Sequence, residues 1–159
     1  MQVKEHVALI EKFYTAFGKK DFSTMCECYH KDLEFEDPAF GVLNYDQTCA
    51  MWTMLLSRNS DIEVTFKNAW SENEFGGVDW EAKYPFSKTG RKVHNVIDAK
   101  FEFKDGLIVG HRDYFDFYKW SRMALGMPGI LLGWTGYLHK KVQAQCSTML
   151  DKFMKEQAS

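Results

Sequence analysis

The sequence lacks several features that mark membrane, secreted or nucleic-acid-binding proteins. Its most apolar segment, residues 123–138, is too short to span a bilayer and is interrupted by glycine and proline. The first residues lack the apolar run of a signal peptide. The 20 basic and 22 acidic residues are mixed along the chain, so no basic stripe is available for nucleic acid. We therefore expect a cytoplasmic protein with no nucleic-acid partner.

Cysteine is sparse, and its spacing argues against a structural role in cross-linking. The four cysteines lie in segments expected to be helical, and Cys26 and Cys28 would point to different faces of one helix. We expect reduced thiols. A chain of 159 residues buries roughly 68–70% of its unfolded surface, so it needs neither disulfides nor metal to fold. We predict no metal and no cofactor.

The first third of the chain has the pattern of helices. Apolar residues spaced three and four apart from Val3 to Phe17 predict an amphipathic helix. Asp21 suits the N-cap of a second, short helix. Asn44 followed by Gln47 is typical of a capping box and predicts a helix over residues 45–56.

Segments of alternating polarity follow and predict a sheet. Helices followed by a run of antiparallel strands indicate an α+β fold. Beyond the sheet, Pro128 suits the first turn of a helix, and apolar residues from Val142 to Phe153 form one stripe. There is no linker, repeat or low-complexity segment. The predicted strands cover about 33–37, 62–66, 75–87, 91–104 and 107–119.

One predicted turn brings two carboxylates together. Asp105-Gly106 between two alternating runs predicts a two-residue hairpin turn, in which Lys104 lies opposite Leu107. Counting back along that ladder places Asp98 opposite Asp113, with both side chains on the same face. The residues expected to share this face are His94, His111 and Phe115.

The orientation of that face stays open from the pattern alone. Two adjacent carboxylates repel unless burial raises one pKa until that group keeps its proton, which is how acid and base roles are divided. However, the apolar residues of the strand 91–104 occupy its odd positions. This alternation would leave Asp98 facing water, and a shift of one residue in register would separate the pair.

Four short segments follow one another along the chain at 13–17 (FYTAF), 35–41 (FEDPAFG), 96–101 (VIDAKF) and 105–108 (DGLI). In their order and spacing they resemble the nuclear transport factor 2-like superfamily, and within it the ketosteroid isomerase and SnoaL-type polyketide cyclase branch. The resemblance implies a cone-shaped fold, in which a curved, mostly antiparallel sheet is backed by N-terminal helices and encloses a pocket. It implies a domain over residues 1–120, with a helical extension over 121–159 packed on the same domain.

The resemblance also implies roles for the three aspartates and turns Asp98 inward. In ketosteroid isomerases, the aspartate of the Glu-Asp-Pro motif is the general base, which corresponds to Asp37. The aspartate of the Val-Ile-Asp strand, here Asp98, donates a hydrogen bond to the developing oxyanion. Asp113 has no counterpart in the isomerases, but acid–base aspartates occur in that region of related polyketide cyclases and epoxide hydrolases.

Two departures narrow the implied activity. Isomerases use a tyrosine of the first helix as a second oxyanion donor, and that position falls on Phe13, with Tyr14 as its neighbour on the inward stripe. Steroid isomerisation itself is therefore disfavoured. Epoxide hydrolases of the limonene type carry an arginine two residues before the strand aspartate, and Val96 stands there. Epoxide hydrolysis is therefore the less favoured alternative, although Asp98 and Asp113 resemble the acid–base pair of those enzymes.

The abundance of aromatic residues suits a pocket for a small hydrophobic molecule. His94 and His111 would lie too far apart to chelate one metal ion. His111 is instead interpreted as a neighbour that tunes Asp113 or as a polar residue at the pocket mouth. The residues expected to bind the substrate are Phe13, Tyr14, Trp52, His94, His111 and Phe115.

Two functions fit these observations. One is an isomerase- or cyclase-type enzyme that moves a proton on a hydrophobic carbonyl compound without a cofactor, through Asp37, Asp98 and Asp113. The other is a non-catalytic binding or dimerisation module of the same fold. We expect a homodimer. The apolar segment Ile130–Trp134 is expected to cap the pocket or join the dimer interface; contact with a membrane surface is the alternative.

Overall fold

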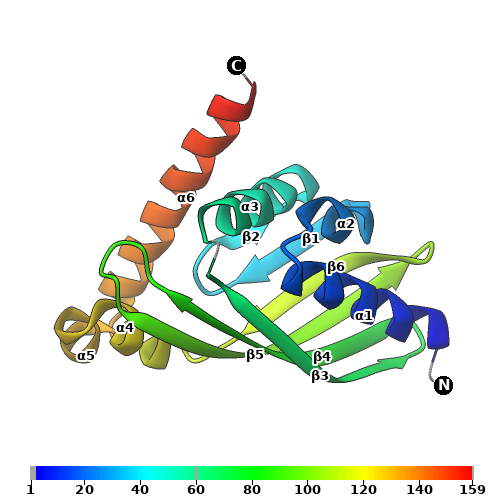
Figure 1. The fold of residues 1–159 in the computed structure, drawn as a ribbon, viewed down its shortest axis with the longest axis horizontal. Helices are drawn as coiled ribbons and strands as arrows, with labels where there is room; N and C mark the ends of the chain where they lie inside the picture. The colour runs from blue at the N-terminus through cyan, green and yellow to red at the C-terminus, as the bar shows by residue number, and fades with distance from the viewer. Residues whose placement is uncertain (1–2, 60, 159) are drawn as a thin grey trace.

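The computed structural model describes residues 3–59 and 61–158 and shows one curved sheet with helices on its inner face and at one end (Figure 1). The order of strands is β2-β1-β6-β5-β4-β3, antiparallel throughout except for the parallel pair β1 and β6. The elements are α1 (Lys4–Gly18), α2 (Phe22–Glu27), β1 (Tyr29–Asp37), β2 (Gly41–Leu43), α3 (Tyr45–Arg58), β3 (Glu63–Glu72), β4 (Phe75–Pro85), β5 (Lys92–Lys104), β6 (Leu107–Tyr114), α4 (Phe117–Leu125), α5 (Met127–Leu132) and α6 (Gly136–Ala158). The predicted α+β class and curved, mostly antiparallel sheet are confirmed.

Local sequence signals place the helix ends as expected. The Asp21 carboxylate accepts a hydrogen bond from the Thr24 backbone N–H at the start of α2. Asn44 and Gln47 form both hydrogen bonds of a capping box at the start of α3. The last predicted strand ends early, at Tyr114, because the Asp116 side chain caps α4.

The main core lies between the inner face of the sheet and helices α1 and α3. Helix α1 buries Phe13, Tyr14 and Phe17 against aromatic residues of α3 and the sheet, including Trp52 and Trp80. Strand β5 alternates strictly, with its odd-numbered residues buried and its even-numbered residues exposed. The even positions of β5 therefore belong to the outer face.

The β5–β6 hairpin contains a bulge that the sequence did not reveal. Lys104 pairs with Leu107 as predicted, and Asp105 and Gly106 both adopt positive φ angles, of 55° and 75°. Phe103 then pairs with Ile108 but Glu102 pairs with Gly110, so the register shifts by one residue. The prediction that Asp98 lies opposite Asp113 is therefore wrong.

The C-terminal helices pack against the open end of the sheet. A second apolar cluster joins Val93 of β5 to Trp120 and Ala124 of α4 and to Leu138 and Val142 of α6. Pro128 lies in the first turn of α5, as predicted. In Figure 1, α6 runs from this end past α3 and carries the C-terminus away from the sheet.

Helix α6 also contacts the turn that follows β1. The side chains of His139 and Gln143 both reach the backbone carbonyl of Pro38, at 2.6 and 3.1 Å. Pro38 directly follows Asp37, so the C-terminal helix supports the turn that carries this carboxyl group. The extension therefore helps to position a predicted site residue.

Candidate active site

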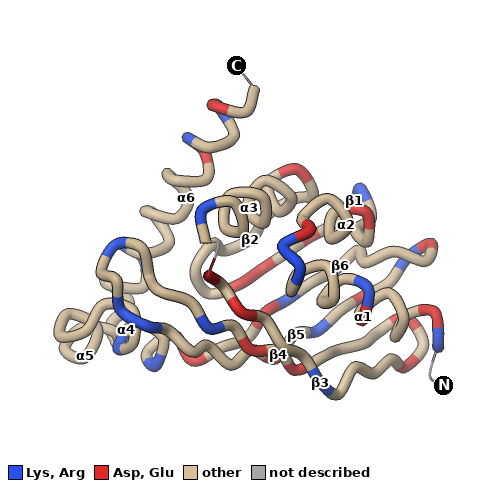
Figure 2. Tube along the Cα trace, viewed as in Figure 1, with Lys and Arg blue, Asp and Glu red and all other residues tan. Residues whose placement is uncertain are grey.

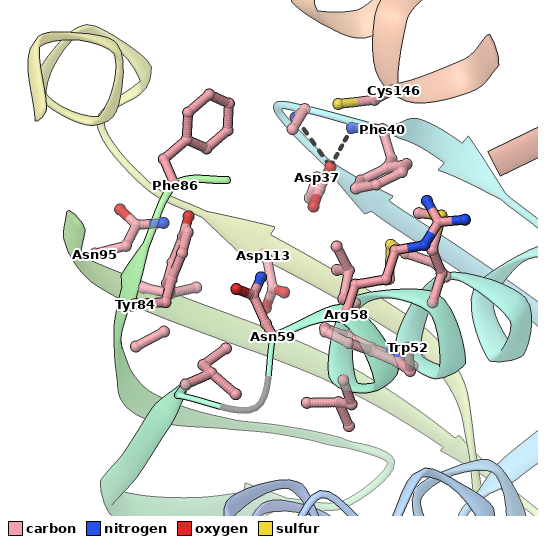
Figure 3. A pocket seen from close by; sticks show the side chains of 18 of the residues that line it. Asp37, Phe40, Trp52, Arg58, Asn59, Tyr84, Phe86, Asn95, Asp113 and Cys146 are labelled. Atoms are coloured by element: carbon pink, nitrogen blue, oxygen red, sulfur yellow. Dashed lines mark hydrogen bonds between the residues drawn. The ribbon is translucent and has the colours of Figure 1, made fainter. Parts of the chain in front are cut away.

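An apolar cavity of about 200 Å³ lies between the inner face of the sheet, helix α3 and the C-terminal helices (Figure 3). Among the described residues that line it, the charged side chains are Asp37, Asp113 and Arg58. Most of the remaining lining is aromatic or aliphatic. It includes Trp52, Trp80, Ile97, Phe115, Trp120 and Met149.

Asp113 is anchored by two N–H donors. It is 5% exposed and projects from the inner face of β6. Its Oδ1 atom lies 3.2 Å from Trp80 Nε1, which donates to it, and 3.0 Å from His111 Nε2. Both donors lie on the same oxygen atom, so they fix the orientation of the carboxyl group and leave Oδ2 without either contact.

A buried chain of hydrogen bonds fixes the orientation of His111. The fully buried imidazole places Nδ1 2.8 Å from the Tyr29 hydroxyl, and that hydroxyl accepts a hydrogen bond from Trp52 Nε1 at 3.0 Å. The indole can only donate, so the Tyr29 hydroxyl accepts from it and keeps its own proton free for His111 Nδ1; the Asp113 carboxylate at Nε2 favours the tautomer in which Nδ1 accepts that proton. His111 then carries its proton on Nε2, where it donates to Asp113.

Asp37 occupies a different environment at the end of β1. Its Oδ1 atom accepts hydrogen bonds from the backbone N–H groups of Ala39 and Phe40, at 2.9 and 2.6 Å (Figure 3). Burial, with a smaller contribution from the negative charge of Asp113, raises the pKa of Asp37 to about 7, although the two N–H groups oppose the shift. Asp37 therefore exchanges its proton near neutral pH.

Two uncharged polar side chains also face the cavity. The Tyr84 hydroxyl accepts a hydrogen bond from Trp120 Nε1 at 2.9 Å, which leaves the phenolic proton available to a bound molecule. Burial raises the pKa of Tyr84, so the phenol keeps that proton. Asn95, 8% exposed, lines the same space from β5.

The arrangement holds two carboxyl groups in one apolar cavity but in different surroundings. Asp113 accepts two side-chain N–H groups, whereas the pKa of Asp37 is raised mainly by burial. Such a pair can hold one proton between an acid and a base at neutral pH. In the described part of the chain, no cluster of three or more His, Cys, Asp or Glu side chains could hold a metal ion.

Comparison with known protein families identifies the fold family. A family model described as a SnoaL-like domain matches residues 10–111, which is more than half of the chain. The chain belongs to the SnoaL-like domain family. A search of curated proteins finds no match to this SnoaL-like protein.

Solved structures agree with this assignment. An epoxide hydrolase from M. tuberculosis, described as LEH-like, is 22% identical with a TM-score of 0.60, and the match covers 84% of this chain and 95% of that protein. IdmH, a candidate polyketide cyclase from Streptomyces antibioticus, is 18% identical with a TM-score of 0.61, covering 71% and 93%. A protein of ketosteroid isomerase-like fold from Catenulispora acidiphila is 12% identical with a TM-score of 0.66, covering 80% and 96%. At these identities the likeness concerns the fold alone.

Two predicted site residues lie on the outer face of this SnoaL-like domain. Asp98 pairs across the ladder with Tyr114, is about half exposed, and lies 3.2 Å from the Lys100 ammonium group. His94, also about half exposed, contacts Glu81 at 2.7 Å. The inward orientation that the family resemblance implied for Asp98 and His94 is corrected, because the even positions of β5 face solvent.

The other predicted residues divide between the cavity and the core. Asp37, Asp113, Trp52 and Phe115 line the cavity. Phe13 and Tyr14 are buried in the core between α1 and the sheet, and the Tyr14 hydroxyl has no hydrogen-bond partner among the described residues. His111 lies behind Asp113 rather than at the mouth of the pocket, so the interpretation as a neighbour of Asp113 describes its position.

The sequence-based prediction did not include several residues of the site. Trp80, Tyr84 and Asn95 line the cavity, and Tyr29 positions His111. The strand patterns alone would have placed Trp80 and Tyr84 inward, since both occupy even positions of β4 with Val78 and Ala82. No sequence signal connects Tyr29 with His111, because they are 82 residues apart and meet only through the parallel pairing of β1 with β6.

Proposed function

We propose that this SnoaL-like protein is an acid–base enzyme that transfers a proton on a small hydrophobic molecule without a cofactor. The observation that carries the proposal is the pair Asp37 and Asp113, which line one apolar cavity in environments of opposite kind. Unequal surroundings divide two carboxyl groups into an acid and a base. Epoxide hydrolases and candidate polyketide cyclases occur among proteins of similar fold.

Asp113 is assigned as the general base and Asp37 as the general acid. The Asp113 carboxylate removes a proton from the carbon next to a carbonyl group, the electron pair of that C–H bond forms the new C=C bond, and the π pair of the C=O bond moves onto the carbonyl oxygen. Protonated Asp37 donates its proton to that oxygen, which gives a neutral enol. In an isomerisation, the enol returns its O–H proton to Asp37 while Asp113 gives its proton to another carbon. In a cyclisation, the enol carbon attacks a second carbonyl group, the O–H proton returns to Asp37, and the oxygen of the attacked carbonyl takes the proton held by Asp113.

The remaining polar groups support this division. Trp80 and His111 keep the Asp113 carboxylate in place through its Oδ1 atom, so Oδ2 is the atom assigned to accept the proton. The Tyr84 hydroxyl, held by Trp120, is assigned as a second donor to the developing oxyanion. This assignment gives Tyr84 the part that the family resemblance had given to Asp98.

Deuterium exchange tests the proposal before the natural substrate is known. Hydrophobic ketones that raise the melting temperature of the protein are incubated with it in D₂O, and exchange next to the carbonyl is followed by proton NMR. Wild-type protein and the matched control Asp98→Asn should both promote exchange. Asp113→Asn should bind the same ketones but lose exchange by about 100-fold or more, as expected for a general base.

The alternative is a binding module with the same cavity and no chemistry. Ketones that bind without any exchange would favour that alternative, whereas exchange that persists in Asp113→Asn would overturn the assignment of Asp113 as the general base. The predicted homodimer remains a separate proposal, with the outer face of the sheet as its interface, and light scattering of the purified protein measures it directly.

A further inference from the structure

The C-terminal lobe, defined as residues 117–150, presents several large apolar side chains to solvent. Six of the most exposed apolar residues of the described chain lie within eleven positions of this lobe. Trp134 is 75% exposed and Tyr137 is 69% exposed. The other four are Met127, Ile130, Leu131 and Leu132. We name these six residues the apolar patch.

Helix α5 differs from an ordinary surface helix because its glycines face the protein and its large apolar side chains face solvent. Its buried positions are glycines: a Cβ atom on Gly129 would overlap the Ser121 backbone carbonyl, and one on Gly133 would overlap the Ser121 hydroxyl. The glycine side of α5 therefore lies directly against α4. This close contact forces Ile130, Leu131 and Leu132 outward, so their exposure is a product of the packing rather than of a frayed end.

The charge around the patch has one sign. Residues 117–150 contain no Asp or Glu, and all 22 acidic residues of the chain lie outside the lobe. The lobe carries Lys119, Arg122, Lys140 and Lys141, and the β4–β5 loop adds Lys88 and Arg91 beside it. Figure 2 shows no red segment along α4, α5 and the first turns of α6.

None of these six cations forms an ion pair with a described carboxylate. Arg91 and Lys88 are instead held near the lobe through uncharged groups. The Arg91 Nε atom donates to the Met123 carbonyl at 2.9 Å, and Lys88 Nζ lies 3.5 Å from Gln145 Oε1. The charges of all six cations are therefore available to an anionic partner.

We propose that the apolar patch and its cations bind the lobe to an anionic membrane surface. Exposed Leu, Ile and Trp beside Lys and Arg are the composition of segments that lie in the lipid interface, where apolar side chains enter the acyl boundary and cations meet the headgroups. Tryptophan and tyrosine are favoured at that depth. The described helices include none long and apolar enough to cross a membrane.

The positive charge of the lobe favours an anionic membrane surface over a second copy of the chain as the partner of the apolar patch. A symmetric dimer through the apolar patch would bring the two sets of unpaired cations together, which disfavours association. An anionic bilayer supplies the opposite charge and a thick apolar layer at the same time. The lobe also contributes Trp120, Cys146 and Met149 to the cavity, so a bilayer at this surface would lie beside the pocket for a hydrophobic molecule.

Vesicle flotation tests the proposal with the full chain. Vesicles of phosphatidylcholine alone are compared with vesicles of phosphatidylcholine and phosphatidylglycerol in equal amounts. The protein should float with the anionic vesicles only, lose this binding at high ionic strength, and show a blue shift of Trp134 fluorescence. Leu131→Glu, and separately the double variant Lys140→Glu with Lys141→Glu, should each weaken binding by about tenfold or more.

Val42→Glu is the matched control, because Val42 is 58% exposed on β2 and lies outside the lobe. Its affinity for anionic vesicles should equal that of the wild type. Equal binding by Val42→Glu and Leu131→Glu, or no binding of the wild type to anionic vesicles, overturns the proposal. Gel filtration of the same samples identifies the competing occupant: a dimer that Leu131→Glu converts to a monomer would assign the patch to a second copy.

Discussion

His111 and Asp113 point from β6 into the molecule, and the imidazole Nε2 atom lies 3.0 Å from the Asp113 Oδ1 atom. The two residues are separated by Arg112, whose side chain is exposed, as the alternation of a strand requires. Tyr29 holds the other side of the imidazole at 2.8 Å. The histidine therefore joins a buried phenol to a carboxylate at the cavity wall.

The first prediction concerns the Tyr29 hydroxyl group, which lies between Trp52 and His111. Tyr29→Phe should lower the free energy of unfolding by about 2–4 kcal/mol, because it leaves the buried donor Trp52 Nε1 and the buried acceptor His111 Nδ1 without partners. Urea denaturation followed by tryptophan fluorescence measures the change. A loss below about 1 kcal/mol would mean that the two groups are satisfied in another way.

Tyr14→Phe is the matched control for that substitution. The Tyr14 hydroxyl is equally buried but has no hydrogen-bond partner among the described residues. Removing it eliminates the cost of burying an unpaired polar group. Tyr14→Phe should therefore leave the free energy of unfolding unchanged or raise it by about 1 kcal/mol.

The second prediction concerns the pH dependence of stability at Asp37. In the unfolded chain this carboxyl ionises near pH 4, whereas in the folded protein burial raises its pKa to about 7. Between these values the folded state binds more protons than the unfolded state, so this group lowers the free energy of unfolding as pH rises from about 4 to about 7. Above about pH 7 its contribution stays level.

Asp37→Asn should remove that dependence. The amide oxygen can still accept the backbone N–H groups of Ala39 and Phe40, so the turn is retained. At about pH 8 the variant should be more stable than the wild type by on the order of 2–4 kcal/mol, and at about pH 4 the two should be equal. Chemical denaturation across this range measures the difference. A constant difference at every pH would place the pKa of Asp37 near that of an ordinary aspartate.

The fold was predictable from sequence because its signals are local. Periodicity located α1, capping residues located the starts of α2 and α3, and the Asp-Gly pair located the turn between β5 and β6. The bulge that follows this turn has no such signal. It depends on how β5, β6 and β1 curve together, and it decides which residue faces Asp113.

The candidate site was therefore predictable only in part. Asp37 and Asp113 line one cavity, but Asp98 lies on the outer face, as the alternation of β5 had indicated before the family resemblance reversed it. The apolar residues at odd positions of this strand were the stronger signal, although Asn95 and Val96 interrupt the pattern, since alternation follows from the geometry of the strand itself. A short motif shared with distant relatives does not fix the orientation of one side chain.

The third prediction follows from the exposure of Asp98. Its contact with Lys100 joins two side chains that are each about half exposed, and ion pairs of this kind contribute little to stability. Asp98→Ala should change the free energy of unfolding by less than about 1 kcal/mol. Urea denaturation measures it, and a large loss would indicate that Asp98 is buried against a partner in solution.

The fourth prediction concerns the glycine side of α5. Alanine normally favours a helix over glycine, but a methyl group on Gly129 would overlap the Ser121 carbonyl, which belongs to backbone and cannot turn away. Gly129→Ala should therefore destabilise the protein by about 1–3 kcal/mol, as overpacking does. Thermal denaturation measures the loss.

Gly136→Ala supplies the comparison, because a Cβ atom there meets nothing within 4 Å and Gly136 begins helix α6. This substitution should leave the melting temperature unchanged or raise it, since it restricts only the unfolded chain. If both variants behave alike, α5 is not held against α4 in solution. If only Gly129→Ala is destabilised, the contact that turns Ile130, Leu131 and Leu132 toward solvent is established independently of any membrane.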